Sequence, residues 1–564
     1  MKKIIKYIVL LIILIGCVVA LIFCFNKLQG KNLLKNLKDI DWIRENVNIS
    51  LSDNLGNNIY EVEKNDNISI FNELYQSVID EKIKYLYDET YDFESPLLVL
   101  NPYGTNNLGL NIYFTTEKEM EISYTISVDN DEIPDFQEIL KNENNSNYTT
   151  DHKYQIIGLV PEEINNIKLV GKTSDGENFE TNFTINMTEV KCNSDTILEN
   201  VSGSSDEELT NGLFVLFGLD KAFNANNYIY DNNGILRADL VLNEYRSDRI
   251  IFSNDKMYYS YDTNKIGVIN KLGKIENTYN LDGYTMHHDY ILDEDNNKLL
   301  VLVNSDKEED STIEDLIISV DIESGNIEEI VDMKDLLPSI YETAEMPESG
   351  KNTYGGTGLD WIHLNSLSII DGKEDIVVSG REISTIIYIE DIYKEPKVKY
   401  LIADDAVYED TEYNDLVLEK IGDFVNQAGQ HTITYVDDSS LDDGQYYLEM
   451  YNNNYGASNT RKDFPWDEYE GVGTYTEGEK SKYYKYLIDE NEGSYELIEE
   501  FNVAYSSIVS SVQDVGDNHI TSSGKSNCYA EYDESGELIK QFNYTSKKYA
   551  YRVFKYDFSD IWFK

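Results

Sequence analysis

Proline, cysteine and basic side chains are all scarce in this chain. Its 564 residues include 8 prolines, 4 cysteines and 47 lysines or arginines, against 104 aspartates and glutamates. The formal charge of −57 would repel a nucleic-acid backbone, so we expect no nucleic-acid partner. No two cysteines have the C-x-x-C spacing of a metal motif. For Cys192 and Cys528, a disulfide and two separate buried thiols both remain open.

A nucleotide-binding loop is also missing. The nearest approach runs from Gly473 to Gly478 and continues with Glu479 and Lys480. An acidic residue therefore stands where a phosphate-binding loop has its Gly-Lys pair. We expect no nucleotide cofactor.

Strand-forming residues are what the chain has in quantity. Its hydrophobic content of 41% can supply the cores of two or more globular units. The 45 tyrosines, with isoleucine, valine and threonine in short runs, favour strands over helices. The composition predicts an all-β protein.

The N-terminus has the pattern of a membrane anchor. Three lysines among the first six residues precede an apolar run from Tyr7 to Phe25, which would reach about 28 Å as a helix. We predict a single-pass anchor over residues 1–26 in the cell membrane, with the rest of the chain extracytoplasmic. Cys17 ends a lipoprotein-like box, so its lipidation remains an alternative.

Three segments follow the predicted anchor. Residues 27–95 show some helical spacing and predict a stalk with a short helical region. Residues 96–190 contain short period-2 segments between polar turns, typical of a small antiparallel β-sandwich. Residues 191–564 repeat an apolar strand, a polar turn and a second strand.

These repeats predict six β-hairpins in the C-terminal part of the chain. A β-propeller is built from such units, each of which needs neighbours to bury its faces. We predict six blades, with a two-sheet arrangement as the alternative. The turns are Asp231–Gly234, Asn270–Gly273, Glu323–Gly325, Glu395–Pro396, Asp489–Gly493 and Asp533–Gly536.

Histidine is rare, with six in the chain, and the spacing of four of them is informative. His287 and His288 are adjacent, His363 follows His288 after 75 residues, and His431 follows after 68 more. Each interval is close to one blade, so these histidines could occupy equivalent inner-strand positions facing the central channel. A histidine that merely packs or hydrogen-bonds is the ordinary alternative for each. His152 and His519 lack comparable context and are interpreted as surface or structural residues.

A cation follows the His363 segment. Arg381 comes directly after the apolar run Val377–Gly380, where its guanidinium could hold an oxyanion. An ordinary salt bridge is the alternative.

Taken in order, the histidine motifs resemble the aryl-sulfate sulfotransferase family. The motifs are HHD at 287–289, DWIHLNS at 360–366, SGREIS at 379–384 and QHT at 430–432. Asn101–Thr105 is similar to the opening of the family's N-terminal domain, and Tyr551–Phe554 to its end. The resemblance implies a six-bladed propeller with an N-terminal β-sandwich. It also implies sulfuryl transfer from a phenolic sulfate donor to a phenol acceptor without nucleotide sulfate, and it allows for a homodimer.

The resemblance implies a role for each site residue. His431 would be transiently sulfated, while His363, Asn365 and Arg381 would hold the sulfuryl oxygens. Either His287 or His288 would complete the site. Since neighbouring strand residues face opposite ways, only one of that pair should point into the channel, and we favour His288. A neutral imidazole can attack sulfur, and a second histidine can give a proton to one phenol and take it from the next.

Two other functions compete with this interpretation. The histidines with Asp289 could form the site of a metal-dependent hydrolase, although the resemblance implies no metal. The chain could also be a non-catalytic surface propeller that binds glycans or proteins. A type I sulfatase is disfavoured because no cysteine begins its C-x-P-x-R pattern.

Overall fold

The computed structural model describes residues 38–564 except for short internal segments. Those segments are 88–89, 143–145, 191–197, 219–225, 245–246, 308–310, 353–354, 457, 462, 466–479 and 546–548. The predicted anchor, Cys17 and Cys192 lie outside the described residues, whereas Cys528 is a buried free thiol. Among the helices that the structure describes, none is both long and apolar enough to cross a membrane.

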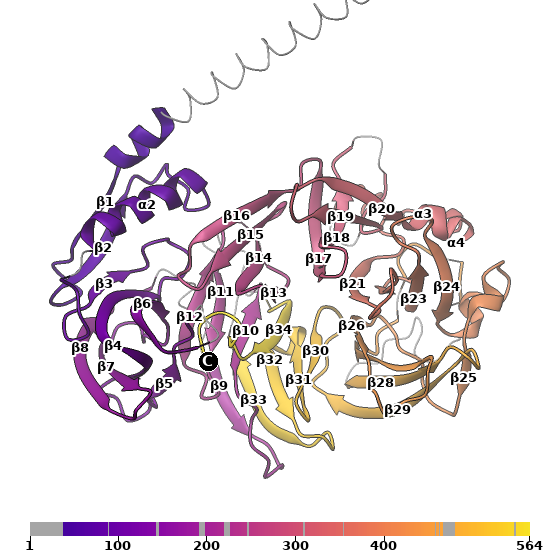
Figure 1. Ribbon diagram of the computed structural model, residues 1–564. Helices are drawn as coiled ribbons and strands as arrows, with labels where there is room; N and C mark the ends of the chain where they lie inside the picture. Colours follow the sequence, from indigo (N-terminus) through magenta and orange to yellow (C-terminus); the bar gives the residue numbers. More distant parts are fainter. Residues whose placement is uncertain are drawn as a thin grey trace, which may run out of the picture.

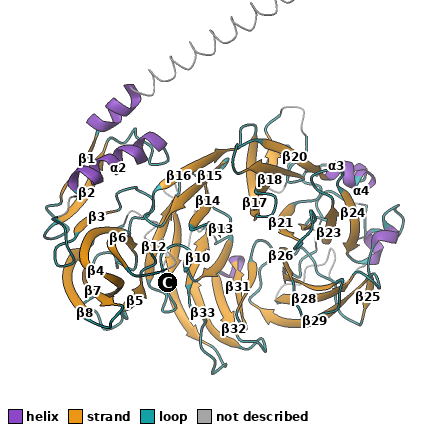
Figure 2. Cartoon of the chain, viewed as in Figure 1, coloured by secondary structure: helices purple, strands orange, loops and turns teal. Residues whose placement is uncertain are grey.

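Strands dominate the molecule, which has an N-terminal sheet region beside a ring of six blades (Figures 1 and 2). The N-terminal sheet has eight strands in the order β1-β2-β3-β4-β7-β8, with β5 and β6 also paired to β4. The long β4 pairs with β3 and β6 through its first half and with β5 and β7 through its second, so it joins two layers of a sandwich-like domain. The strands are β1 (Val47–Leu51), β2 (Ile59–Lys64), β3 (Leu97–Leu100), β4 (Leu110–Ser127), β5 (Phe136–Ile139), β6 (Thr149–Ile156), β7 (Ile164–Thr173) and β8 (Asn178–Asn186).

The segment that we expected to be a stalk is partly folded onto this domain. Its predicted helical region is present as α2 (Glu73–Leu86). The preceding residue Asn72 caps this helix, because its side chain accepts a hydrogen bond from Leu74 N. Residues 47–64, however, form β1 and β2, and β2 runs parallel to β3. The buried side chains of β1 and α2 pack in one cluster with those of β3. The alternating burial of β1 is that of a sheet strand.

Each blade of the propeller has four antiparallel strands, to which one blade adds β25 in parallel, and this confirms the prediction of six blades. The C-terminal strand β34 is the innermost strand of the blade that contains β10, β11 and β12, and this closes the ring. Strand β9 is added to the outer edge of the last blade. The six blades are β34 (Arg552–Tyr556) with β10 (Leu213–Phe217), β11 (Asn226–Tyr230) and β12 (Leu236–Val241); β13 (Ile250–Ser253), β14 (Lys256–Asp262), β15 (Lys265–Asn270) and β16 (Ile275–Asn280); β17 (Tyr284–Asp293), β18 (Lys298–Ser305), β19 (Leu316–Asp321) and β20 (Ile327–Asp332); β21 (Leu364–Ile369), β22 (Ile376–Gly380), β23 (Thr385–Glu390) and β24 (Lys397–Ile402); β26 (His431–Val436), β27 (Gln445–Asn452), β28 (Ser481–Asp489), β29 (Ser494–Val503) and β25 (Glu419–Ile421); and β30 (Ser511–Val515), β31 (Asn518–Ser523), β32 (Cys528–Tyr532), β33 (Leu538–Tyr544) and β9 (Leu198–Ser202).

All six predicted turns join the third and fourth strands of a blade, on the outside of the ring. Their first residues explain why they form. Asp231, for example, accepts hydrogen bonds from the backbone N–H groups of Asn233 and Ile235, and Gly234 takes a φ of 79°. The strands between the turns are often buried on both faces, as in β10, β11 and β22, because neighbouring blades cover them.

Side chains of the Asn101–Thr105 motif and its surroundings join the N-terminal domain to the propeller. Thr105 Oγ1 donates a hydrogen bond of 2.6 Å to Gly273 O, and Thr105 O accepts one of 2.9 Å from Val241 N. Asn107 donates to both oxygens of Asp239, at 2.6 and 2.7 Å. Apolar side chains of both parts share one core cluster. The motif is therefore a joint between the domains.

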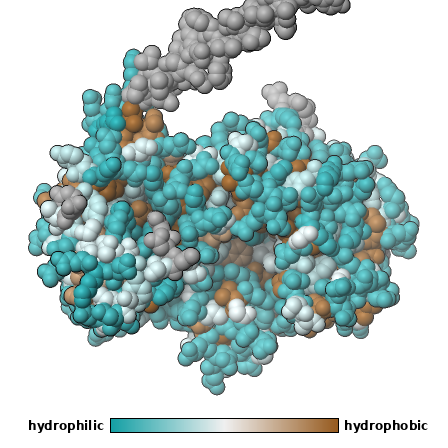
Figure 3. All heavy atoms as spheres, in the orientation of Figure 1, coloured by the Kyte–Doolittle hydropathy of each residue, from teal (hydrophilic) through white to brown (hydrophobic). Residues whose placement is uncertain are grey.

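The inner strands β17, β21, β26, β30 and β34 follow one another around the centre of the ring and contact one another in that order. In Figure 3 the visible face is hollowed in the middle of the propeller, with apolar atoms in the hollow. Two short helices, α3 (Met333–Leu336) and α4 (Pro338–Glu342), lie between β20 and β21. The predicted site histidines and Asn365 lie on these inner strands or directly before them, whereas Arg381 follows β22, the second strand of its blade.

Candidate active site

Three inner strands are irregular where they carry the motif histidines. Strand pairing shifts register between Met286 and Tyr290 in β17, directly after Leu364 in β21 and between His431 and Thr434 in β26. The left-handed backbone, costly for residues other than glycine, occurs at His288 (φ 60°), His363 (φ 56°) and Thr432 (φ 56°). Bulges of this kind re-aim side chains at functional sites. The repeated irregularity places three histidine segments at related positions in neighbouring blades.

The irregularity in β17 brings His287 and His288 together. Their Nδ1 atoms lie 3.0 Å apart, and both rings are buried. The rule that neighbouring strand residues face opposite ways therefore does not hold at this bulge. The ring of His288 also lies 4.8 Å from that of His363 and 5.4 Å from that of Tyr551, measured between centroids.

His363 is held between two carboxylates. Its Nδ1 lies 2.5 Å from Glu314 Oε2 and 2.9 Å from Asp360 Oδ2, and all three side chains are buried. Burial by itself would lower the pKa of His363, but the negative charges of Asp360 and Glu314 outweigh it and raise that pKa to about 10. His363 is therefore an imidazolium at neutral pH.

His431 has the opposite surroundings. Its Nδ1 lies 2.7 Å from Asn453 Oδ1 and 3.0 Å from Gly429 O. The Asn453 amide orientation is fixed because its Nδ2 donates to Ser506 O and Val509 O. Both partners of His431 Nδ1 are acceptors, so Nδ1 carries the proton.

The second nitrogen of His431 therefore has a lone pair. His431 Nε2 accepts a long hydrogen bond of 3.2 Å from Val509 N. Burial and the positive charge of Arg381 lower the pKa of His431 well below its ordinary value, so the ring stays neutral. A neutral imidazole with an Nε2 lone pair can act as a nucleophile.

The guanidinium of Arg381 lies close enough to His431 and Glu314 to act on the pKa of each. Its positive charge lowers the pKa of His431 and opposes the rise in the pKa of Glu314 that burial causes. The side chain is 7% exposed, and its Nε has no hydrogen-bond partner among the residues that the structure describes. Its backbone N–H donates to His363 O. A buried guanidinium with an unused donor suits an anionic ligand.

Glu382 anchors a loop beside this arginine. Its carboxylate accepts hydrogen bonds from Ser458 Oγ and Asn459 N, in the segment that follows Asn453. Burial raises the pKa of Glu382 to about 7. The segment after β27 is thus tied to the Arg381 region as well as to His431.

Asn365 and Asp289 have structural partners. Asn365 Nδ2 donates to the carbonyl of Gln430, the residue before His431, at 2.8 Å. Asp289 is fully buried between Arg249 and Arg552, with N–O distances of 2.8 Å to each. Burial would raise the pKa of Asp289, but the two arginines outweigh it and lower that pKa. Arg552 also donates to Asn365 O, which links three blades.

Two overlapping sets of side chains could be considered for a metal ion. They are His287 and His288 with Glu314, and Glu314 with Asp360 and His363, with possible ligand atoms within 4.8 Å of one another. Nitrogen and oxygen ligands at about 2.0–2.1 Å from a tetrahedral zinc ion lie about 3.3 Å apart. The 2.9 Å from His363 Nδ1 to Asp360 Oδ2 is instead a hydrogen-bond distance, and the 2.5 Å to Glu314 Oε2 is that of a close ion pair. The geometry fits a proton on Nδ1 better than a metal ion.

The remaining histidines lie outside this cluster and are buried. His152 hydrogen-bonds with Thr116 and Tyr154, and burial lowers its pKa to about 4. His519 lies between Asp514 (2.7 Å) and Glu499 (3.2 Å). Both have the side-chain partners typical of structural residues.

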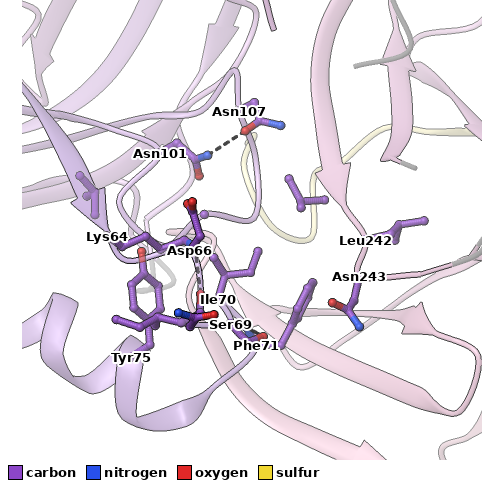
Figure 4. Close-up of a pocket in the computed structure, with 15 residues that line it drawn as sticks. Lys64, Asp66, Ser69, Ile70, Phe71, Tyr75, Asn101, Asn107, Leu242 and Asn243 are labelled. Carbon is purple, nitrogen blue, oxygen red and sulfur yellow. Dashed lines mark hydrogen bonds between the residues drawn. The ribbon is translucent and has the colours of Figure 1, made fainter. Parts of the chain in front are cut away.

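A pocket of about 530 Å³ lies at the joint between the N-terminal domain and the propeller (Figure 4). Lys64, Phe71 and Tyr75 line it on one side, and Leu242 and Asn243 on the other. It shares no residue with the histidine cluster.

Sequence reasoning placed the motif histidines and Arg381 but missed several of their partners. Asp360 and Arg552 stood inside the motifs DWIHLNS and YRVF without an assigned role. Glu314 and Asn453 belong to no motif, and their spacing from the histidines follows no repeat. Glu314 does share one feature with His288 and His363, a left-handed φ of 62°, which only the fold reveals.

Two family models match the chain. "Arylsulfotransferase (ASST)" matches residues 198–558, and "Arylsulfotransferase Ig-like domain" matches residues 97–188. No curated protein matches the sequence significantly.

Similar solved structures include two from Bacteroides and one dehydrogenase. A candidate 6-phosphogluconolactonase of Bacteroides fragilis shares 10% identity at a TM-score of 0.33, covering 78% of this chain and 99% of its own. One of Bacteroides uniformis shares 8% identity at a TM-score of 0.33, covering 77% and 99%. Dihydro-heme d1 dehydrogenase NirN shares 10% identity at 0.31, covering 64% and 80%. Similarity this low supports no conclusion about activity.

Proposed function

The chain belongs to the arylsulfotransferase family and is an aryl-sulfate sulfotransferase, and we propose that it works in two steps through a sulfated His431. In the first step Nε2 attacks the sulfur of a phenolic sulfate, and the bond from sulfur to the phenol oxygen breaks. The electron pair of that bond stays on the departing oxygen. In the second step a phenol attacks the same sulfur, and the bond between Nε2 and sulfur breaks.

The observation that carries this proposal is the tautomer of His431. Asn453 and Gly429 accept from Nδ1, which leaves the lone pair on Nε2, and the lowered pKa keeps that lone pair available at neutral pH. The long hydrogen bond from Val509 N–H to Nε2 competes only weakly for this lone pair. When substrate binds, a sulfuryl oxygen could accept the Val509 N–H instead.

Arg381 and His363 supply the positive charge. Negative charge on the sulfuryl oxygens and the departing oxygen grows toward the transition state, so fixed cations beside them stabilise it more than the ground state. Arg381, with its unused Nε donor within the described part of the chain, and the imidazolium of His363 suit this role. Asn365, which holds Gln430, supports His431 from the backbone side, and His288 completes the site beside His363.

Trapping the intermediate tests the proposal. Protein turning over 4-nitrophenyl sulfate without acceptor is quenched, and its intact mass is measured. We expect one added sulfuryl group on the peptide that contains His431, removed when phenol is added before quenching. His431→Ala should show no increment. Turnover without any increment, or an increment that phenol does not discharge, would contradict the two-step mechanism.

A chelator separates this function from metal-dependent hydrolysis. Because the distances at His363 fit a proton, we expect unchanged phenol-stimulated release of 4-nitrophenol after treatment with a chelator. Loss of activity that zinc restores would favour the hydrolase.

We also infer a cell-membrane location, on the strength of the apolar run from Tyr7 to Phe25 alone. Cells that produce the full chain should hold it in the membrane fraction, accessible to protease from outside. A chain recovered in the cytosol would refute this inference.

A further inference from the structure

The carboxylate of Glu314 lies between two of the site histidines. Its Oε2 is 2.5 Å from His363 Nδ1, and its Oε1 is 3.8 Å from His288 Nδ1. A backbone hydrogen bond also joins Glu314 to the His363 segment, because the N–H of Leu364, the residue after His363, donates to Glu314 O at 2.8 Å. Glu314 is 6% exposed and has a φ of 62°. A strained, buried carboxylate between two histidines requires a reason.

Asp360 adds a second carboxylate to the same nitrogen. Its Oδ2 lies 2.9 Å from His363 Nδ1, and its Oδ1 has no hydrogen-bond partner among the described residues. Ionised carboxylates only accept hydrogen bonds, so Nδ1 must carry a proton. The two negative charges also favour a second proton on the opposite ring nitrogen, Nε2.

We propose that Glu314, together with Asp360, is a positioning residue of the transfer reaction: it holds His363 as a doubly protonated imidazolium whose Nε2–H protonates the departing phenolate oxygen. The proposal rests on the function given above. It adds the two carboxylates that keep the general acid of that reaction, His363, protonated.

The proton balance is complete. As the bond from sulfur to the donor oxygen breaks, that oxygen keeps the electron pair and takes the proton of His363 Nε2. His363 is then neutral, with its Nδ1–H still donated to Asp360 Oδ2 and close to Glu314 Oε2. In the second step the acceptor phenol gives its proton to Nε2 while its oxygen binds sulfur. The enzyme returns to its starting state without any other reactant.

The acidity that results suits this exchange. Although burial opposes it, Asp360 and Glu314 raise the pKa of His363 to about 10. An ordinary phenol, such as a tyrosine side chain, has a pKa of about 10, and a proton moves readily between groups of matched pKa. An unperturbed histidine would be too weak a base to take the proton back. The titratable and charged groups near His363 are Glu314, Asp360, Glu382, Arg381, His288 and His431.

The test compares Glu314→Gln with Asp315→Asn. Asp315 is the adjacent residue, is also buried, and accepts a hydrogen bond of 2.9 Å from the Trp361 indole instead of contacting a histidine. Both changes remove one carboxylate at nearly constant volume. For each variant, kcat/KM is measured over pH with two donors, phenyl sulfate and 4-nitrophenyl sulfate. Nitrophenolate departs more readily than phenolate and needs a proton less.

We expect Glu314→Gln to lose at least about tenfold more activity with phenyl sulfate than with 4-nitrophenyl sulfate. The alkaline limit of its pH profile should also move below the wild-type position, so that lower pH partly restores the rate. Asp315→Asn should keep the wild-type ratio between donors and the wild-type limit. If the role of Glu314 were purely structural, kcat/KM would fall by the same factor with both donors.

Three outcomes overturn the inference. One is an unchanged donor ratio and pH limit in folded Glu314→Gln. If this variant does not fold, Asp360→Asn gives the same two readouts, with the same consequence. The third is loss of wild-type activity with a chelator and its recovery with zinc. If the wild type transfers no sulfuryl group at all, the proposed function itself fails.

Discussion

The two sides of the site hold their histidines in opposite charge states. His363 faces Glu314 and Asp360 and is protonated, whereas His431 faces an amide and a backbone carbonyl, lies near Arg381 and is neutral. Both rings are buried, so burial alone cannot explain the difference. Their partners decide it. Environments that push two pKa values apart assign one group as acid and the other as nucleophile or base.

Removing the neutral histidine, His431, should have the largest effect on activity. His431→Ala leaves no nucleophile, and we expect sulfuryl transfer to fall by roughly 10⁴-fold or more. The measurement is phenol-stimulated release of 4-nitrophenol. The donor-binding residues remain, so the folded variant should still bind donor. Residual transfer within tenfold of the wild type would show that His431 is not the nucleophile.

Placing a carboxylate beside His431, like those beside His363, should have a smaller effect. Asn453→Asp places a carboxylate on Nδ1 of His431, which raises the pKa of that histidine. We expect kcat at neutral pH to fall about 10- to 100-fold, because a protonated ring has no lone pair. The acid limit of the pH profile should move upward, and activity should recover partly at higher pH. An unmoved acid limit would mean that Asn453 does not set the charge state.

In the wild type the pKa values of His431 and His363 predict a broad plateau in the pH profile of kcat/KM. The neutral form of His431 is lost only when pH falls through its lowered pKa, well below 6.5. The protonated form of His363 is lost when pH rises through about 10. We expect kcat/KM for the donor to vary little between these limits. A profile with an acid limit near 6.5 would contradict the lowered pKa of His431.

A third histidine tests whether the surroundings alone make a catalytic group. His519 lies between Asp514 and Glu499, and these contacts raise its pKa to about 9 although burial opposes the rise. It belongs to β31, outside the cluster. We expect His519→Gln to keep transfer within about twofold while losing about 1–3 kcal/mol of stability, measured by denaturant unfolding. A selective loss of activity at full stability would place His519 in the site.

Local features of the chain could be predicted from sequence patterns, whereas a bulge and a long-range strand pairing could not. The hairpin turns could be predicted because Asp231 and its counterparts form hydrogen bonds within a few residues. The rule of alternating side chains was wrong at His287 and His288 because the bulge in β17 breaks the alternation. The stalk prediction missed β1 and β2 because this pair of strands joins the sheet only through the contact of β2 with β3, across more than thirty residues.

By itself the sequence determined the six hairpins, the strand-rich composition, and the order of the motifs that carry His288, His363, Arg381 and His431. These features depend on turn chemistry and on side-chain types near one another in the chain. Only the tertiary structure decided which histidine is charged. Protonation in a buried site is set by neighbours within a few ångströms, and Glu314 and Asn453 reach the histidines from other segments of the propeller.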